Sequence, residues 1–125
     1  MSEIATQRAV MLAVGGRPDC RVFRNTLGVA WHGVVESYDS ERLVLRNARR
    51  VKYGVQNPGG ADLLGWRTVN GVARFLAIEV KSEREQTTEA QDAFLHAVIR
   101  AGGIGIVARS VEDAIRGLED AFPPV

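Results

Sequence analysis

The pair Asn70-Gly71 stands between two apolar runs, and such a pair is the strongest short-range signal for a β-hairpin. The runs on either side of it, residues 61–66 and 73–81, are therefore predicted to be antiparallel neighbours. The second run, ARFLAIEVK, is short and almost wholly apolar. A run of this kind is typical of a central strand that is covered on both faces. The fold must therefore be built around this hairpin.

The remainder of the chain predicts helices and strands on both sides of the hairpin. Residues 3–13 have helical spacing, residues 20–24 alternate as a short strand, and Thr88 to Gln91 fit a capping box at the start of a helix. A strand at 104–108 and a helix from Ser110 follow. We therefore predict one α/β domain over residues 1–125, a mixed β-sheet flanked by helices in the order α-β-β-β-α-β-α.

The stretch from about residue 26 to residue 50 has no clear period. Residues 31–35 and 43–45 are compatible with short strands, and residues 36–40 are typical of an exposed turn. Residues 57–60 (NPGG) predict a turn that leads into the hairpin. Trp31 and Trp66 could each stack on a nucleic-acid base, but we assign both to core packing.

Length and composition exclude several classes of protein. The chain has 125 residues, 46% apolar and 25% charged, as expected of one soluble globular domain. Cys20 is the single cysteine, which excludes a disulfide framework and a cysteine-rich zinc site. The first ten residues contain Glu3 and Arg8 and do not resemble a secretory signal, and no apolar run is long enough to span a membrane. We expect a cytoplasmic protein that does not bind membranes.

The net charge of +1 conceals an asymmetry along the chain. Residues 1–60 carry a charge of +4 and residues 61–125 a charge of −3, and arginine greatly outnumbers lysine. The planar guanidinium of arginine suits phosphate, so the first half favours a nucleic-acid partner. The alternative is a codon bias towards arginine that has no functional meaning.

Two charged residues, Glu79 and Lys81, stand at the end of the apolar second strand of the hairpin. Side chains two apart on a strand share a face, so these two project together while Val80 points into the core. Burying two charges is costly unless they pair with each other or with another group such as a metal ion. A simple ion pair at a strand end is the alternative to a functional site.

Asp62 lies at the start of the first strand of the hairpin, seventeen residues before Glu79. In an antiparallel pair closed at Asn70-Gly71, the start of one strand lies beside the end of the other, so the two carboxylates are predicted to converge. Magnesium prefers oxygen ligands and is usually held by one or two carboxylates with waters and substrate phosphate. The carbonyl of Val80 is a plausible third ligand.

The pattern Asp62, then Glu79-Val80-Lys81, resembles the D…(D/E)XK signature of the PD-(D/E)XK nuclease superfamily. Four segments narrow the resemblance to the virus-type replication-repair nuclease (VRR-NUC) family. They are residues 60–66 (GADLLGW), 75–81 (FLAIEVK), 88–94 (TEAQDAF) and 102–104 (GGI). Ala61 stands where the superfamily has proline, which removes no chemical group.

The resemblance implies a restriction-endonuclease-like core and a metal-dependent phosphodiesterase. Asp62, Glu79 and the Val80 carbonyl would bind Mg²⁺, or Mn²⁺ in its place, and Lys81 would assist the attacking water. Gln91 would lie near the same site, although the capping box accounts for it equally well. Glu3 matches a glutamate that many such nucleases carry on the first helix, and an exposed acid at a helix start is the alternative.

Basic residues before residue 57 are candidates for holding DNA. Phosphate contacts of this kind are salt-dependent and carry little sequence information. The alternative is a solvated surface loop. The predicted DNA-binding residues are Arg24, Asn25, Arg46, Arg49, Arg50, Lys52 and Tyr53.

The resemblance leads to a hypothesis of an endonuclease that cuts branched or Holliday-junction-like DNA in a bacterial or phage-infected cell. A two-fold substrate needs two active sites, which predicts a homodimer. Two alternatives remain: a non-catalytic nucleic-acid-binding module, and a restriction-type or RNA-processing endonuclease with the same chemistry.

Overall fold

The computed structural model describes residues 2–56 and 58–123. The chain divides into two compact units, of which one is Thr26–Gln56 and the other contains the rest of the described residues. We call the first the hairpin unit and the second the main unit, and each is described by itself. No helix in the described residues is long and apolar enough to cross a membrane.

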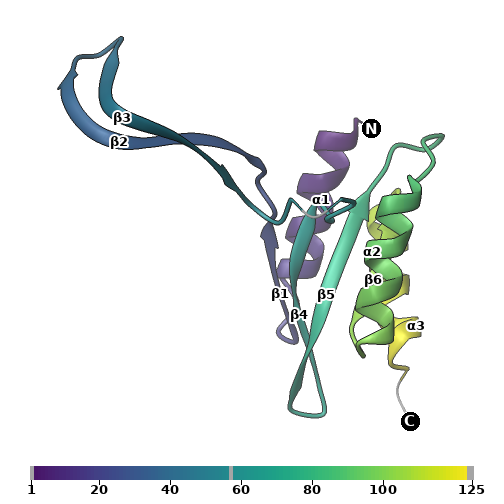
Figure 1. Ribbon diagram of the computed structural model, residues 1–125. Coiled ribbons are helices and arrows are strands. Elements are labelled where there is room, and N and C mark those ends of the chain that lie inside the picture. The colour runs from purple at the N-terminus through teal and green to yellow at the C-terminus, as the bar shows by residue number, and fades with distance from the viewer. Residues whose placement is uncertain (1, 57, 124–125) are drawn as a thin grey trace. The chain divides into compact units, whose positions relative to one another are not determined.

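The main unit contains three helices and four strands, and the hairpin unit contains two strands (Figure 1). In chain order the elements are α1 (Glu3–Gly15), β1 (Cys20–Arg24), β2 (Gly28–Tyr38), β3 (Leu43–Tyr53), β4 (Leu63–Val69), β5 (Val72–Val80), α2 (Glu89–Arg100), β6 (Ile104–Ala108) and α3 (Val111–Ala121).

The mixed α/β class is confirmed, and the predicted order α-β-β-β-α-β-α is wrong in its strand count. Five strands stand between α1 and α2, because β2 and β3 are added between β1 and the central hairpin. The sequence indicated only short strands at residues 31–35 and 43–45, and their full length was not predicted because no residue of the hairpin unit is buried. Without burial on one side, the sequence lacks the strict alternation that marks a half-buried strand.

The central hairpin forms as the sequence predicts. Asn70 and Gly71 have φ values of 51° and 77°, the left-handed conformations that a two-residue type I′ turn requires. Strands β4 and β5 extend from this turn in antiparallel register, with Val69 opposite Val72 and Leu63 opposite Ile78. The sheet order is β1-β4-β5-β6, and β6 runs parallel to β5. Strand β5 is therefore central, as expected.

Helices cover the two faces of this sheet unequally. Val10 and Val14 of α1 and Leu118 of α3 join the larger core cluster, which includes Ile78 and Val80 of β5. Leu95 and Val98 of α2 join a smaller cluster with Ala77 and Ala61. Because residues 77, 79 and 81 alternate with 78 and 80, Glu79 and Lys81 lie on the α2 face.

The hairpin unit is a two-stranded antiparallel ribbon of β2 and β3. Residues 36–38 continue β2 and the turn lies at residues 39–42, so the predicted turn at 36–40 is displaced. The oxygen Oδ1 of Asp39 accepts the main-chain N–H groups of Glu41 and Arg42, which stabilises this turn.

The prediction that Trp31 and Trp66 pack in the core is wrong. Trp31 on β2 is 62% exposed, and Trp66 on β4 is 40% exposed. The ring of Trp66 lies against Phe23 of β1, with 5.9 Å between ring centroids. Trp66 lies on β4, whereas α2 packs on β5 and β6 of the same sheet.

Candidate active site

The strand register places Asp62 beside Glu79. Leu63 of β4 is opposite Ile78 of β5, so the next position along each strand brings Asp62 opposite Glu79. Side chains of opposed residues share a face of an antiparallel pair, so the two carboxylates converge. On its other side Asp62 is tied to the end of β1, because its carbonyl accepts the main-chain N–H of Asn25 at 2.8 Å.

Glu79 is a buried carboxylate with spare bonding capacity. Its residue is 4% exposed, and its Oε2 has no hydrogen-bond partner among the described residues. Burial, repulsion by Asp62 and a hydrogen bond between the two carboxyl groups raise the pKa of Glu79 to about 8, against an opposing effect of Lys81. The raised pKa therefore favours the protonated form of Glu79 in the metal-free protein.

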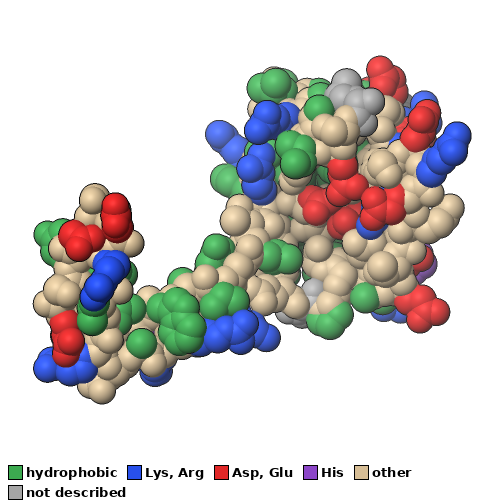
Figure 2. Space-filling view, turned by 90° about the horizontal axis from the view of Figure 1, so that it is seen from above, with side chains coloured by type: hydrophobic (Ala, Val, Ile, Leu, Met, Phe, Trp, Pro, Cys, Tyr) green, Lys and Arg blue, Asp and Glu red, His purple; other side chains and the backbone are tan. Residues whose placement is uncertain are grey.

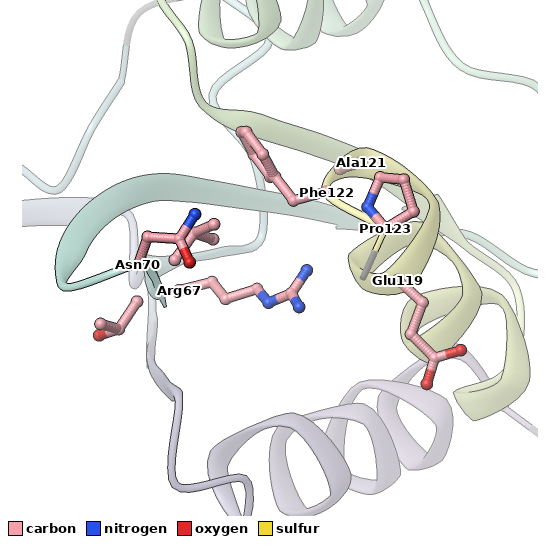
Figure 3. Close-up of a pocket in the computed structure, with 8 residues that line it drawn as sticks. Arg67, Asn70, Glu119, Ala121, Phe122 and Pro123 are labelled. Atoms are coloured by element: carbon pink, nitrogen blue, oxygen red, sulfur yellow. The ribbon is translucent and has the colours of Figure 1, made fainter. Parts of the chain in front are cut away.

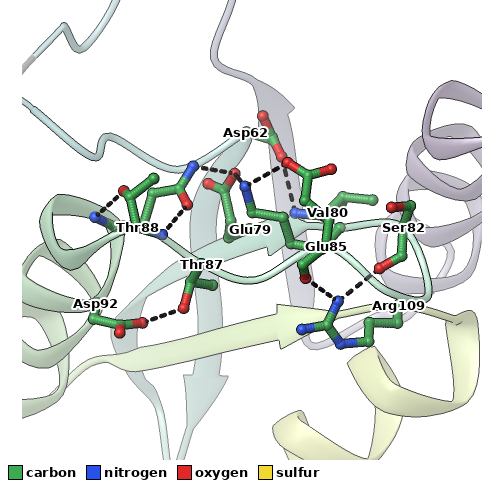
Figure 4. Close-up of polar contacts among 11 residues, drawn as sticks. Asp62, Glu79, Val80, Ser82, Glu85, Thr87, Thr88, Asp92 and Arg109 are labelled. Carbon is green, nitrogen blue, oxygen red and sulfur yellow. Dashed lines mark hydrogen bonds and ion pairs between the residues drawn. The ribbon is translucent and has the colours of Figure 1, made fainter.

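The carboxylate of Asp62 is oriented by the main chain of β5. The N–H of Val80 donates to its Oδ2 at 2.8 Å, as one of the dashed lines in Figure 4 shows. The pairing of β4 with β5 ends at Leu63 and Ile78, and the N–H of Val80 beyond this point donates to the Asp62 carboxylate. The carboxylate is thereby fixed towards Glu79, and no side chain is needed to orient it.

Lys81 follows β5 directly and is 5% exposed. Its Nζ lies 3.1 Å from an Oε1 of Glu85 and 3.9 Å from Oε1 of Glu79. The closer partner, Glu85, is on the segment between β5 and α2. The ammonium group therefore stands between one buried and one exposed carboxylate, so the alternative of a simple Glu79–Lys81 pair describes only part of its environment.

Arg109 holds the segment that carries Glu85. Its guanidinium donates to the carbonyls of Ser82 and Glu85, each at 2.6 Å (Figure 4). Sequence reasoning missed both Glu85 and Arg109. The one available signal was the four-residue spacing between Lys81 and Glu85. This spacing predicts an ion pair only if the segment after β5 is known to turn back on itself.

Gln91 makes the contacts that both interpretations of the sequence require. Its Oε1 accepts the main-chain N–H of Thr88 at 2.9 Å, which completes the capping box of α2. Its Nε2 donates to Oε1 of Glu79 at 3.0 Å. The same amide therefore starts the helix and holds the buried carboxylate.

Gly59 allows α2 to approach the segment before Asp62. Its φ is +83°, and a Cβ there would stand 2.0 Å from the carbonyl oxygen of Ala90. Only glycine fits this contact. The first turn of α2, with Gln91, is thereby brought to the carboxylates. Asn57 of the predicted 57–60 turn lies outside the described residues.

Glu3, at the start of α1, belongs to the same electrostatic neighbourhood. Partial burial, a hydrogen bond with Glu85 and repulsion by Glu85 and Asp62 raise its pKa, and Lys81 opposes them. The side chain is exposed. Figure 2 shows a group of acidic side chains on this part of the main unit. Glu3 is thus near the predicted site, on an element that lies before β1.

The carboxylates fit a divalent cation held partly by water or substrate. Asp62 and Glu79 supply hard oxygen donors, and the unpartnered Oε2 of Glu79 is a buried acceptor of the kind that a cation satisfies. No group of three or more His, Cys, Asp or Glu side chains in residues 2–56 and 58–123 is placed to hold a metal. Two carboxylates with waters are sufficient for Mg²⁺.

The predicted DNA-binding residues lie on two parts of the chain. Arg24 ends β1, and the side chain of Asn25 donates to the carbonyl of Ala61 at 3.0 Å, so Asn25 helps to hold the strand that leads to Asp62. The remaining five residues lie on strand β3. The alternative interpretation, in which they belong to a surface loop, is therefore wrong. The five residues are Arg46, Arg49, Arg50, Lys52 and Tyr53.

A pocket of about 800 Å³ lies at the other end of the β4–β5 hairpin, and Figure 3 shows its lining. It contains Asn70 of the turn and Phe122 after α3. Arg67 also lines it and is tied to Asp19 and to the carbonyl of Leu118. Since this guanidinium is engaged within the fold, the pocket has a structural explanation and is separate from the carboxylates.

The order and spacing of Asp62, Glu79 and Lys81 match the D…(D/E)XK pattern, and the three residues lie at one end of a mixed sheet. The VRR-NUC domain family matches residues 17–112, and the chain belongs to this family. No curated protein matches the chain. The match includes the hairpin unit and begins after α1, so Glu3 lies outside it. Membership implies a hydrolase that acts on DNA, in a superfamily that generally uses a divalent metal.

Proposed function

We propose that this protein is a metal-dependent endonuclease that hydrolyses phosphodiester bonds in DNA. The observation that carries the proposal is the pair Asp62 and Glu79, in which the buried Oε2 of Glu79 has no hydrogen-bond partner among the described residues. A structural ion pair would have used that oxygen. The family match over residues 17–112 supports the same chemistry.

Asp62, Glu79 and the main-chain carbonyl of Val80 would hold Mg²⁺, with Mn²⁺ able to replace it. When bound, such a cation activates a water molecule and neutralises charge that develops on the phosphate. Before it binds, the pKa of Glu79 is raised to about 8, so that proton must leave for the full charge of the pair to form.

Lys81 assists the attacking water and stabilises negative charge on the phosphate. Its burial and its position between Glu79 and Glu85 keep the ammonium group near the carboxylates. Gln91 holds Glu79 in place through Nε2 and is proposed as part of the catalytic set. Glu3, on α1, is proposed to bind a water at the edge of the site.

The basic side chains of β3 and the end of β1 are proposed to bind the DNA backbone. Arg46, Arg49, Arg50 and Lys52 are on one strand that has no acidic residue, and Tyr53 follows them. Arg24 and Asn25 lie next to Asp62. We propose branched DNA as the preferred substrate, a homodimer as the active form, and residues 1–125 as one functional domain, which the family match across both units supports.

Cleavage assays on three substrates test the proposal. Labelled four-way junctions, linear duplexes and RNA hairpins are incubated with the full chain in Mg²⁺, Mn²⁺ or EDTA. We expect cleavage of the junction that requires the metal, and a loss on the order of 10³-fold in Asp62→Asn, which keeps the acceptor for the Val80 N–H but removes the charge.

The matched control is Asp120→Asn on α3, an exposed aspartate away from the carboxylate pair. It should cleave at the wild-type rate. Equal activity of Asp62→Asn and wild type would contradict the proposal. Binding of DNA without cleavage of any substrate would instead identify a non-catalytic binding module, and preferential cleavage of RNA would identify an RNA-processing enzyme.

A further inference from the structure

Three aromatic side chains form an exposed group on the main sheet, one from each of the neighbouring strands β1, β4 and β5 (Figure 1). Phe23, Trp66 and Phe75 are between 40% and 53% exposed. The rings of Phe23 and Trp66 are tilted by 51° to each other, so they do not stack face to face. Exposed apolar patches of this kind often mark binding sites. We call these three residues the aromatic cluster.

The aromatic cluster lies on the same face of the sheet as the carboxylates. Trp66 comes four residues after Asp62, and Phe75 comes four residues before Glu79. Side chains at even spacing on a strand share a face, and four residues extend over about 13 Å. Trp66 is also opposite Phe75 in the strand register. One open surface therefore leads from the rings to the candidate active site.

A hollow of about 410 Å³ is formed at the aromatic cluster. The other described residues that line it are Leu64, Gly65 and Ala73, so its walls are apolar. Phe23 is opposite Leu64 in the register, which places its ring on the same face. Sites of about 300–1,000 Å³ hold small organic ligands. The hollow therefore has room for a flat apolar group such as a nucleobase.

The charge around the aromatic cluster suits a nucleic-acid strand. Arg21 is exposed and lies opposite Trp66, and Arg24 is exposed at the end of the same strand. Strands β1 and β4, which the structure describes in full, contain no acidic residue, and β5 contains Glu79 alone. Aromatic rings beside cations are the combination that binds single-stranded nucleic acid.

We propose that the aromatic cluster stacks the bases of an unpaired DNA strand that leads to the carboxylates. Every base has a π face that can stack on an aromatic ring, whereas the bases of a duplex are already stacked on each other. At about 3.4 Å per nucleotide, a distance of about 13 Å corresponds to about four nucleotides. The inference rests on the proposed function and deepens it, because it makes an unpaired strand the feature by which branched DNA is recognised.

The same surface is less suited to a protein partner. A protein that covered the three rings would also bury the guanidinium of Arg21, which costs free energy unless that protein supplies an acid. A nucleic-acid strand supplies a phosphate with every nucleotide. Stacked bases and neighbouring phosphates therefore satisfy the rings and the arginine together.

Fluorescence anisotropy of the full chain in EDTA, where cleavage is absent, tests the inference. The probes are two labelled duplexes, one with an unpaired oligothymidine arm and one with an arm of equal length made of abasic sites. Both arms carry the same phosphates, so a difference in affinity reports the bases alone. We expect the abasic arm to bind at least about fivefold more weakly.

Two substitutions at one position separate stacking from general apolar contact. Trp66→Phe keeps an aromatic face and should bind the thymidine arm within about twofold of wild type. Trp66→Leu is apolar without a π face and should bind that arm at least about fivefold more weakly. Thermal denaturation checks that both variants fold. The control is Leu12→Ala, which removes an exposed apolar side chain from α1 and should bind as wild type does.

Equal affinity of the wild type for the two arms, or equal affinity of Trp66→Phe and Trp66→Leu for the thymidine arm, would overturn the inference. So would dissociation of a wild-type dimer by Trp66→Leu with no loss of affinity for the arm, because the face would then belong to a second copy. Sedimentation equilibrium measures this.

Asp62→Asn separates the inference from the proposed function. That variant should keep the preference for the thymidine arm while it loses cleavage. A wild type that prefers the thymidine arm and cleaves no DNA would contradict the endonuclease and support the aromatic cluster as a strand-binding surface. A wild type that cleaves DNA but binds both arms equally would overturn the role of the aromatic cluster alone.

Discussion

The carboxylate end of the main sheet buries charged side chains, whereas the hairpin unit exposes apolar side chains. The first buries Glu79 and Lys81 at 4% and 5% exposure, whereas the second exposes Trp31 at 62%. Lys81 is paired with Glu85 and Gln91 donates to Glu79, whereas repulsion by Asp62 raises the pKa of Glu79 and favours its protonated form.

The difference shows where each region obtains its stability. The main unit is stable through its own core and can therefore retain an electrostatically unfavourable site. The hairpin unit has no buried residue and is held together by the pairing of β2 with β3. The following predictions test this contrast, from the largest expected effect to the smallest.

Truncation of an apolar side chain should matter in one unit only. Leu76 is fully buried in β5, and Leu76→Ala should lower the free energy of unfolding by about 2–5 kcal/mol. Val35 of β2 is 54% exposed, and Val35→Ala should lower it by less than about 0.5 kcal/mol. Urea denaturation of both variants measures this. Similar losses would show that the hairpin unit contributes equally to the cooperative core.

The stability of the metal-free protein should fall as pH rises. Folding raises the pKa of Glu79 from 4.5 to about 8, so the folded state favours the protonated carboxyl. The resulting stabilisation is complete below about pH 4.5 and is lost as pH rises through 8. Between pH 5 and 8 in EDTA, we expect the Tm to fall by about 5 °C or more.

The control for this pH effect is Glu79→Gln, which cannot ionise. Its thermal midpoint should depend much less on pH over the same interval, and added Mg²⁺ should raise the wild-type midpoint more than that of the variant. A wild-type midpoint that rises from pH 5 to 8 in EDTA would contradict the raised pKa of Glu79.

Loss of charge on β3 should weaken DNA binding without changing the chemistry of the site. Arg49→Gln with Arg50→Gln should lower affinity by about tenfold and reduce the salt dependence of log K by about 2. Fluorescence anisotropy in EDTA, where cleavage is absent, measures both. Arg8→Gln with Arg100→Gln removes two exposed charges from helices as a control. An unchanged salt slope in the β3 variant would exclude these phosphate contacts.

The smallest effect is expected at Glu85, which we interpret as a positioning residue for Lys81. Glu85→Gln removes the carboxylate 3.1 Å from Nζ and should lower kcat by about threefold with little change in KM. The pH profile of cleavage should also change, because the charge near Lys81 changes. Glu83→Gln, an exposed neighbour, is the control. Identical kinetics and pH profiles in both variants would argue against this role.

Much of the site was predictable because it depends on local signals. Asn70-Gly71 sets a two-residue turn, the turn sets the register, and the register brings Asp62 opposite Glu79. The capping box of α2 was equally visible at Thr88 and Gln91. Each step depends on neighbours in sequence or on one short hairpin.

Other parts were not predictable, for two reasons. Strands β2 and β3 have no buried face. Their sequences therefore do not show the strict alternation of apolar and polar residues from which the length of a strand is predicted. Glu85 and Arg109 meet across 24 residues, through main-chain carbonyls that any residue could supply. A contact of this kind leaves no mark in residue type or spacing.

By itself, the sequence determined the turn, the caps, the central strand and the order of its charged residues, because these follow from backbone preferences and the two-residue period of a strand. Only the tertiary structure decided that Glu79 is 4% exposed, that its Oε2 has no hydrogen-bond partner in residues 2–56 and 58–123, and that its pKa is raised to about 8. Those properties depend on how tightly α2 and the neighbouring strands enclose one carboxylate, since desolvation is set by the atoms that surround it in space.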